Sequence, residues 1–499
     1  MGTTKLGIAA GSKRGAEAAQ NVARQGGNAV DACLAATITG WVAEPFFTSI
    51  GGSGFIAVRS PDAEVEIIDG NNGMPWTQPR EAGQGLQRVF LPAYADGIYV
   101  GVGAGSVGVP GVLAAIRLAW ERHGAIEWPA LFEYAIQTAR EGFPFPKTSA
   151  YYLSATWDGL WSQFPVSESL FSSDGEPLLE DAHFVQPLLA EALEVVAEKG
   201  PDVFYKGELA QEIEEQLADG DGFLTVEDLS RYTAEIRSPV STNALGLLIE
   251  SNPPPAVGGA VLTHMLALLD GVDLSDPLER LRSIVEAQRA AVGYRREKYQ
   301  DPTSIAAGLE EALEDLRSRP IKSPSTTHSS AADSNGYACS MTASNGYGAG
   351  LVVHGMLLND TLGEEELNPL GVHSLPPGAR CHSNQTPTIA TGKGTTVALG
   401  SPGADRIVTA ITQTLIRIAV DGDTLADAVA APRAHLDLRP QGETLCFEPG
   451  LPGDQLPYIP RPYDETHMYF GAVQAASIGD DGHVEAAHDP RRSGGSAVV

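Results

Sequence analysis

The sequence contains the stretch Ser325-Thr326-Thr327-His328, in which a pair of threonines directly follows a polar segment. A threonine hydroxyl is a poor nucleophile until a base lies beside it. If the peptide bond before Thr326 breaks, the freed α-amine lies on the same residue and can accept the hydroxyl proton. The pKa of a free α-amine is about 7.7–8.0, which suits a general base near neutral pH. The stretch therefore predicts an N-terminal threonine nucleophile, although taken alone it also fits an ordinary loop before a strand.

The segment that precedes the threonine pair favours an exposed cleavage site. A charged helix is predicted from Leu309 to Arg317, and Arg319-Pro320-Ile321-Lys322-Ser323-Pro324-Ser325 follows it. The two prolines prevent a helix there and favour an extended loop. Exposed loops of this kind are where chains are most readily cut. Cleavage between Ser325 and Thr326 would yield a large fragment, residues 1–325, and a small fragment, residues 326–499.

Composition and charge limit the possible partners. The chain has 33 basic and 63 acidic residues, which gives a formal net charge of −30 at pH 7. This charge argues against nucleic acid and anionic membranes as partners. A hydrophobic content of 43% is enough for a buried core. No window approaches eighteen consecutive apolar residues, so no transmembrane helix is expected.

The cysteines and the N-terminus point weakly to a compartment. The four cysteines are far apart and lack a CxxC spacing, so neither disulfides nor a metal site is expected. The N-terminus carries Lys5 but no continuous apolar segment, so no signal peptide is predicted and a cytoplasmic location follows. Export stays open if the chain is a trimmed form of a longer precursor.

Helices and strands are mixed along the whole chain. Residues 14–25 and 29–43 are predicted helices, and the second is so apolar that it must be buried. Residues 55–58 and 65–68 read as two strands of a hairpin. Further helices are predicted at 110–122, 129–141, 184–198, 207–218, 278–299 and 404–420, short strands within 328–358, and a strand at 396–399.

Characteristic short motifs surround the threonine pair over nearly the whole sequence. They are Gly26–Ala32, Glu44-Pro45, Gly51–Phe55 and Val109–Gly111 before it, and Gly346–Gly350, Met356–Asp360, Pro377–Arg380, Pro387-Thr388, Gly400–Ala404 and Asp489–Arg492 after it. Their order and spacing closely resemble the γ-glutamyltranspeptidase family of N-terminal-nucleophile hydrolases. The resemblance implies an α+β fold, a four-layer αββα sandwich with two stacked, mostly antiparallel sheets between helical layers. Both fragments would then form one intertwined domain.

The resemblance also implies a reaction. Thr326 resembles the family's nucleophile, which attacks the Ser325 carbonyl during maturation and the γ-amide of a glutathione-like substrate afterwards. Water or an amine acceptor then resolves the acyl-enzyme, and no metal or organic cofactor is needed. Gly403 and Ala404 match a glycine pair whose backbone N–H groups stabilise the oxyanion. Alanine at the second position is tolerable if its φ angle is ordinary.

Residues for substrate recognition match the family less closely. Arg80 resembles the arginine that binds the substrate α-carboxylate, although it also fits an ordinary surface arginine. Glu364 aligns with an aspartate that holds the α-amino group, and Thr361 replaces the glutamine beside it. Other positions that resemble family site residues are Ser344, Asn345, Ser383 and Asn384.

The altered amino-group pocket leaves other functions open. The leading prediction is a γ-glutamyltransferase or γ-glutamyl hydrolase, with a small-molecule substrate and water or an amine as acceptor. A second is an amidase of the same fold that acts on another acyl group, such as a dicarboxylate monoamide or an acylated β-lactam. A third is a non-catalytic homologue that never cleaves itself.

Overall fold

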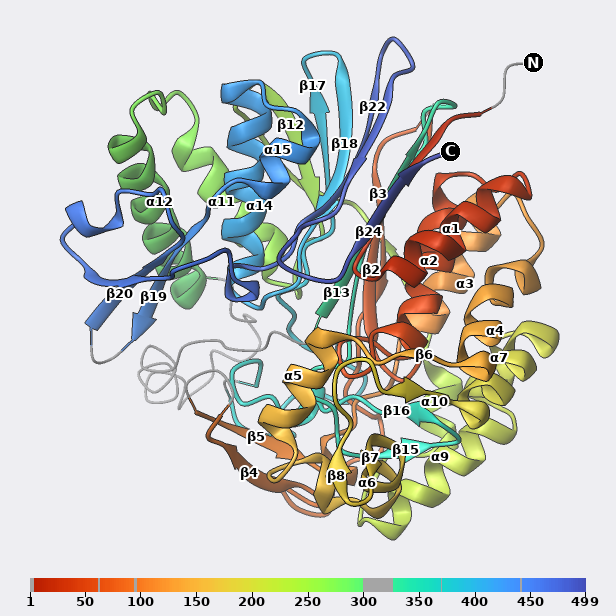
Figure 1. The fold of residues 1–499 in the computed structure, drawn as a ribbon. Coiled ribbons are helices and arrows are strands. Elements are labelled where there is room, and N and C mark those ends of the chain that lie inside the picture. The colour runs from red at the N-terminus through yellow and green to blue at the C-terminus, as the bar shows by residue number, and fades with distance from the viewer. Residues whose placement is uncertain (1–3, 62, 94–96, 299–325, 369, 440–441) are drawn as a thin grey trace.

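A computed structural model describes residues 4–61, 63–93, 97–298, 326–368, 370–439 and 442–499. Ser325 and the predicted helix from Leu309 to Arg317 lie outside these described residues. The centre of the molecule holds two sheets, with strand orders β10-β3-β2-β14-β13-β1-β24 and β11-β12-β17-β18-β22-β23 (Figure 1). Every strand pair within the two sheets is antiparallel.

The strands of both sheets come from both ends of the chain. The first sheet consists of β10 (Glu235–Arg237), β3 (Glu66–Gly70), β2 (Ser53–Arg59), β14 (Ala338–Ser344), β13 (Thr326–Asp333), β1 (Leu6–Ala10) and β24 (Gly495–Val498). The second consists of β11 (Val240–Ala244), β12 (Leu247–Ser251), β17 (Thr388–Gly392), β18 (Thr395–Gly400), β22 (Gln474–Gly479) and β23 (Val484–Ala487). Each sheet therefore contains strands from both sides of residue 325, and in the first sheet β1 lies between two strands from the C-terminal side.

Helices cover the outer face of each sheet. The first sheet packs against α1 (Lys13–Arg24), α2 (Ala29–Ala43) and α3 (Val112–His123), and the second against α11 (Gly258–Leu269), α14 (Arg406–Ile416) and α15 (Leu425–Ala430) (Figure 1). The inner faces of the sheets contact each other through β13, β14, β18 and β22. The predicted four-layer αββα sandwich is therefore confirmed.

The remaining described elements extend this sandwich. The other helices are α4 (Glu133–Glu141), α5 (Lys147–Thr156), α6 (Pro165–Phe171), α7 (Pro187–Lys199), α8 (Asp202–Tyr205), α9 (Glu208–Asp219), α10 (Val226–Arg231) and α12 (Pro277–Lys298). Small sheets are formed by β4 (Gln87–Leu91) with β5 (Ile98–Val102), and by β19 (Ala434–Arg439), β20 (Gly442–Phe447) and β21 (Ile459–Pro462). None of the described helices is both long enough and apolar enough to cross a membrane.

Helix α2 shows how the local sequence builds the site. The Asn28 side chain accepts hydrogen bonds from the N–H groups of Val30 and Asp31, and the Asp31 carboxylate bonds back to the Asn28 N–H. This reciprocal cap fixes where the helix begins. All 15 residues of α2 are buried, as its apolar sequence predicts. The helix ends at Glu44 and so brings a carboxyl group to the inside of the molecule.

The register of three strands aligns three hydroxyl groups. Thr326 on β13 lies opposite Ser344 on β14, and Ser344 lies opposite Ser53 on β2. Directly opposed residues of antiparallel strands place their side chains on the same face of the sheet. One end of the first sheet therefore carries a row of hydroxyls that begins with the predicted nucleophile.

Most predicted elements are confirmed, with two informative differences in their bounds. The helix predicted at 129–141 begins with a 3₁₀ turn, Trp128–Leu131, and α4 starts only at Glu133. The helix predicted at 404–420 starts at Arg406 and continues as a π turn, Arg417–Asp421. Its start is later because Ala404 has a positive φ angle, which a right-handed helix excludes.

Candidate active site

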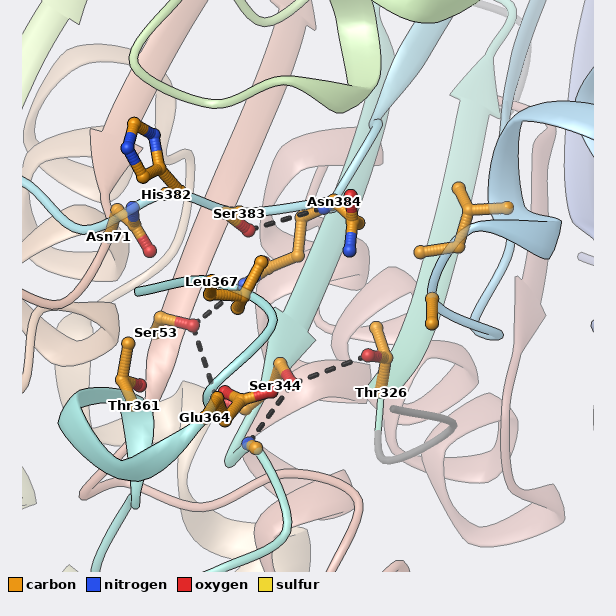
Figure 2. A pocket seen from close by; sticks show the side chains of 14 residues that line it. Ser53, Asn71, Thr326, Ser344, Thr361, Glu364, Leu367, His382, Ser383 and Asn384 are labelled. Carbon is orange, nitrogen blue, oxygen red and sulfur yellow. Dashed lines mark hydrogen bonds between the residues drawn. The ribbon is translucent and has the colours of Figure 1, made fainter. Parts of the chain in front are cut away.

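A cavity lies at the end of the hydroxyl row. Its described lining residues are Ser53, Asn71, Thr326, Ser344, Gly346, Thr361, Glu364, Leu367, His382, Ser383, Asn384, Gln385, Ala404 and Ile407. Seven of the predicted site residues are in this lining: Thr326, Ser344, Thr361, Glu364, Ser383, Asn384 and Ala404. Segments far apart in the sequence thus meet around one hydroxyl, as Figure 2 shows.

The hydroxyl of Thr326 is almost buried and already engaged. Its side chain donates a hydrogen bond to Ser344 Oγ at 3.3 Å, and the Gly346 N–H donates to the same Ser344 oxygen at 3.2 Å (Figure 2). Thr326 is only 4% exposed. The Ser344 hydroxyl therefore fixes the direction of the threonine oxygen at the wall of the cavity.

Two buried ionisable side chains, those of Glu44 and Arg492, contact the threonine pair. Thr327 Oγ1 donates to Glu44 Oε2 at 2.7 Å, and Arg492 Nη1 donates to the Thr326 carbonyl oxygen at 2.8 Å. The guanidinium of Arg492 also lies over the ring of Phe47, 4.8 Å from its centroid. Arg492 thus holds the main chain of Thr326 through its carbonyl oxygen.

Glu44 is an acid with an unusual environment. Burial raises the pKa of its carboxyl to about 7, against the opposing effects of the Thr327 hydrogen bond and the Arg492 charge. Sequence analysis treats Glu44 and Arg492 only as motif residues and assigns neither a contact with the threonine pair. The one available signal is a glutamate at the end of an entirely apolar helix.

We expect Glu44→Gln to remove a pH-dependent loss of stability. Because the folded pKa of about 7 lies above the ordinary value of 4.5, the wild-type chain loses stability as pH rises through this interval. Glutamine has no such loss, so the variant should gain about 2 kcal/mol relative to the parent between pH 5.5 and pH 8. Urea unfolding at pH 5.5 and pH 8 measures this difference in free energy, with Thr326→Ala present in both proteins so that neither is expected to cleave itself.

The matched control for this prediction is an exposed acid. Glu198 lies on the solvent side of α7, and Glu198→Gln should shift stability equally at both pH values. A pH-independent difference for Glu44→Gln would show that the carboxyl of Glu44 does not titrate in this interval.

The predicted oxyanion loop has a strained residue. Gly403 has a φ of +126° and Ala404 a φ of +56°. The condition given above for a tolerable alanine, an ordinary φ angle, is therefore not met at Ala404, where the chain turns sharply before α14 begins. A left-handed conformation costs a residue with a Cβ about 1–2 kcal/mol. Ala404 lines the cavity, whereas Gly403 is not among its described lining residues.

Replacing Ala404 by glycine should stabilise the protein. We expect Ala404→Gly to raise the free energy of unfolding by about 0.5–1 kcal/mol, because glycine adopts the positive φ without strain. Activity should be retained, since the backbone N–H is unchanged. Ala114→Gly within α3 is the control and should destabilise by a similar amount. A lower free energy of unfolding for Ala404→Gly would contradict the inference that the positive φ of Ala404 is strained.

The acidic side of the cavity forms around Gly346. A Cβ at this position would lie 2.1 Å from Asp360 Oδ1 and 2.7 Å from Glu364 Oε1, and its φ is +65°. Only glycine fits there. Thr361 faces the cavity and accepts a hydrogen bond from Asn72 Nδ2 at 2.6 Å. The turn thus brings the predicted amino-binding residue, Glu364, to the wall of the cavity.

Two predicted substrate residues lie outside the cavity lining. Asn345 is fully buried, and its Nδ2 donates to the Leu358 carbonyl at 3.3 Å. The Arg80 side chain is 73% exposed and pairs with Asp221. The roles predicted for these two residues stay predictions. Sequence analysis assigns no role to several polar residues of the lining. Ser53 lies within the quoted motif Gly51–Phe55, and His382 and Gln385 adjoin the predicted pair Ser383 and Asn384.

The chain is similar to known proteins in both sequence and fold. A family model described as Gamma-glutamyltranspeptidase matches residues 15–499. The glutathione hydrolase proenzyme of Escherichia coli (strain K12) is 28% identical over 94% of this chain and 88% of its own. The crystal structure of a cephalosporin acylase from Bacillus halodurans matches with a TM-score of 0.83 at 22% identity, covering 99% of this chain and 96% of that one.

A second solved structure comes from the matching family itself. The γ-glutamyltranspeptidase of Helicobacter pylori gives a TM-score of 0.52 at 26% identity, covering 61% of this chain and 87% of that one. The cephalosporin acylase likeness concerns the fold alone. Because the family model extends over nearly all of the sequence, from the first helix to the last residue, the chain belongs to the γ-glutamyltranspeptidase family.

Proposed function

We propose that the protein is a self-cleaving enzyme that hydrolyses or transfers the acyl group of γ-glutamyl amides such as glutathione. The observation that carries the proposal is the position of Thr326, whose hydroxyl bonds to Ser344 at the wall of a cavity that also contains Glu364. Family membership supports the same chemistry. The alternative is an amidase that acts on another acyl group. Such an enzyme would cleave glutaryl-p-nitroanilide, which lacks the amino group, faster than the γ-glutamyl anilide.

Maturation uses the threonine hydroxyl against its own chain. Thr326 Oγ attacks the carbonyl carbon of Ser325, the C–N bond breaks as the departing nitrogen takes the hydroxyl proton, and an ester joins the two fragments. Water hydrolyses this ester, which leaves a carboxylate on Ser325 and a free amine on Thr326. The fragments 1–325 and 326–499 remain together as a heterodimer, because β1 pairs with β13 on one side and β24 on the other.

Catalysis uses the amine that maturation releases. This amine accepts the Thr326 hydroxyl proton while the oxygen attacks the substrate amide carbon. The N–H groups of Gly403 and Ala404 stabilise the tetrahedral oxyanion. The leaving amine takes the proton, and an acyl ester forms on Thr326. Water or a second amine then attacks the ester and regenerates the hydroxyl.

Recognition of the acyl group rests on the side of the cavity opposite Thr326. Glu364 supplies a carboxylate for the substrate ammonium, and Ser383 and Asn384 supply neutral polar groups. Thr361 is shorter than the family's glutamine, so the site holds the substrate amino group less tightly. A looser site admits water as easily as an amine acceptor, so we expect hydrolysis to dominate over transfer.

The proposal is tested by locating the acyl group. The purified protein is mixed with γ-glutamyl-p-nitroanilide, quenched with acid during turnover and analysed by intact mass. We expect the small fragment, and not the large one, to gain one glutamyl residue that peptide mapping places on Thr326. Thr326→Ser should show the same adduct. Release of p-nitroaniline by an uncleaved chain, or an adduct elsewhere, would contradict the mechanism.

A further inference from the structure

A second cavity lies among the helices beside the second sheet. Its described lining comes from α12, the C-terminal part of α14 with the π turn that follows, α15 and the segment that leads into β19 (Figure 1). Its volume is about 90 Å³, against about 30 Å³ for the cavity beside Thr326, and the two described linings share no residue. One water molecule needs only about 10–15 Å³. The second cavity therefore has room for a small organic molecule.

The lining of the second cavity combines apolar surface with positive charge. Buried side chains such as Leu281 and Ile416 supply the apolar surface. The charged residues of the described lining are three arginines, Arg280, Arg417 and Arg433, and no aspartate or glutamate is among them. Arginine pairs well with carboxylates, and apolar walls with a few polar groups are typical of small-molecule sites. A molecule of matching chemistry has a negative charge and a short hydrocarbon chain.

Three hydrogen-bond donors of this lining have no acceptor. They are Nε of Arg417, Nε of Arg433 and Oγ1 of Thr414, all buried and without a hydrogen-bond partner among the described residues. Thr414 and Arg433 are each 1% exposed, and an unsatisfied buried donor is costly. The Gln413 amide is engaged at both ends, because Oε1 accepts from the Ala434 N–H at 2.9 Å and Nε2 donates to the Ala434 carbonyl at 2.9 Å. The unmet need is therefore for acceptor oxygens.

The carboxylates that pair with the three arginines lie outside the described lining. Asp421 pairs with Arg280 at 2.7 Å and with Arg417 at 2.9 Å, and Asp489 pairs with Arg433 at 2.7 Å. These pairs use the Nη atoms, so they leave Nε of Arg417 and Arg433 without an acceptor. Burial lowers the pKa of the Arg433 guanidinium below its ordinary value, although the charge of Asp489 opposes this. A further negative charge beside Arg433 is therefore favourable.

We propose that the second cavity binds a small carboxylate that carries a short apolar chain. The carboxylate oxygens accept hydrogen bonds from the unpartnered donors of Thr414, Arg417 and Arg433, and the chain packs against Leu281 and Ile416. This site is separate from the reaction proposed above and does not depend on it.

Titration of the purified protein with hexanoate tests the inference. Isothermal titration calorimetry should show one saturable site with a Kd of about 1 mM or lower. Three probes are matched to hexanoate: 1-hexanol lacks the charge, hexylammonium reverses it, and acetate lacks the chain. We expect 1-hexanol and acetate to bind at least about tenfold more weakly and hexylammonium not to bind.

Two variants assign the binding to this cavity. Thr414→Val removes the hydroxyl with little change of shape, and Arg417→Lys keeps a positive charge but has no Nε. Each should weaken hexanoate binding by about tenfold. Thr412→Val and Arg282→Lys are the matched controls, because neither position is among the described lining residues, and both should bind as the parent does. Ser383→Ala alters the other cavity and should also bind hexanoate normally.

Each outcome has a defined meaning. No saturable binding of hexanoate, or equal binding of 1-hexanol or hexylammonium, would overturn the inference. Hexanoate affinity that is unchanged in both Thr414→Val and Arg417→Lys, or lost in Ser383→Ala, would place the ligand elsewhere and also overturn it. Circular dichroism checks that each variant is folded, and the half-exposed Arg417→Lys decides alone if Thr414→Val does not fold. None of these measurements involves turnover, so the proposed function stands or falls separately.

Discussion

Thr326→Ala should abolish both maturation and activity. The purified variant is expected as a single chain of 52.5 kDa, whereas the wild type, divided in the ratio of 325 to 174 residues, gives fragments of ~34 and ~18 kDa. Loss of a nucleophile lowers turnover by about a thousandfold or more. Denaturing gel electrophoresis and release of p-nitroaniline from the γ-glutamyl anilide measure the two effects.

Two controls make this result specific. Thr326→Ser keeps a hydroxyl at the same place and should cleave and turn over, more slowly than the wild type. Thr327→Val removes only the hydrogen bond to Glu44 and should leave the cleavage position unchanged. Efficient cleavage of the Thr326→Ala chain would show that another group, or a contaminating protease, cuts the protein.

Asp489→Asn should strongly destabilise the fold. Asp489 is fully buried and accepts from Arg433 Nη1 at 2.7 Å and from Arg491 Nη1 at 3.1 Å. Glu448, also buried, pairs with Arg491, so the four side chains carry no net charge. Removing one carboxylate leaves an uncompensated buried cation, which costs about 3–5 kcal/mol. Urea unfolding in the Thr326→Ala background measures the loss.

The pH dependence of this loss follows from the same contacts. Burial alone would raise the pKa of Asp489, but Arg433 and Arg491 hold it below the ordinary value of 3.8. The stabilisation is therefore present above this value and disappears as pH falls through the lower folded pKa. The difference between variant and parent should shrink in acid below about pH 4. Asp481→Asn at an exposed turn should cost less than about 0.5 kcal/mol at any pH.

Asp489→Asn should also slow self-cleavage. Asp489 accepts hydrogen bonds from the N–H groups of Val473 at 2.8 Å and Arg491 at 2.9 Å, and so fixes the chain just before Arg492. Arg492 is the residue that donates to the Thr326 carbonyl oxygen. A loosened Arg492 holds Thr326, the proposed nucleophile, less firmly. If the variant is destabilised but still cleaves at the wild-type rate, the ion-pair cluster stabilises the fold without positioning Thr326 for cleavage.

Elements defined by local signals could be predicted from the sequence. Helix α2 matches its predicted bounds because its cap at Asn28 and its apolar run are both local. The beginning of α14 could not be placed, because the positive φ of Ala404 is imposed by the turn that leads from β18. The same turn carries Gly403 and Ala404, the proposed oxyanion residues, so one turn explains both the misplaced helix start and the position of these two residues.

The site was predictable where motifs mark it and not where packing creates it. The lining segments around Ser344, Glu364 and Ser383 follow from motif order. The contacts of Glu44 and Arg492 depend on how α2 and the C-terminal turn pack beneath β13, and no short pattern encodes that. For Arg80 the motif was misleading. Its position in the sequence resembles that of a substrate-binding arginine, but its side chain pairs with Asp221 and is not among the described lining residues of the cavity beside Thr326.

Because both sheets contain strands from both fragments, cleavage after residue 325 would make unfolding depend on protein concentration. Across the first sheet, β2 of the large fragment pairs with β14, and β1 of the large fragment lies between β13 and β24 of the small fragment. Neither fragment retains an intact sheet alone. Before cleavage, unfolding is a unimolecular process whose midpoint is independent of concentration. After cleavage, unfolding is also dissociation, so mass action makes the mature enzyme more heat-stable in concentrated solution and more fragile when diluted.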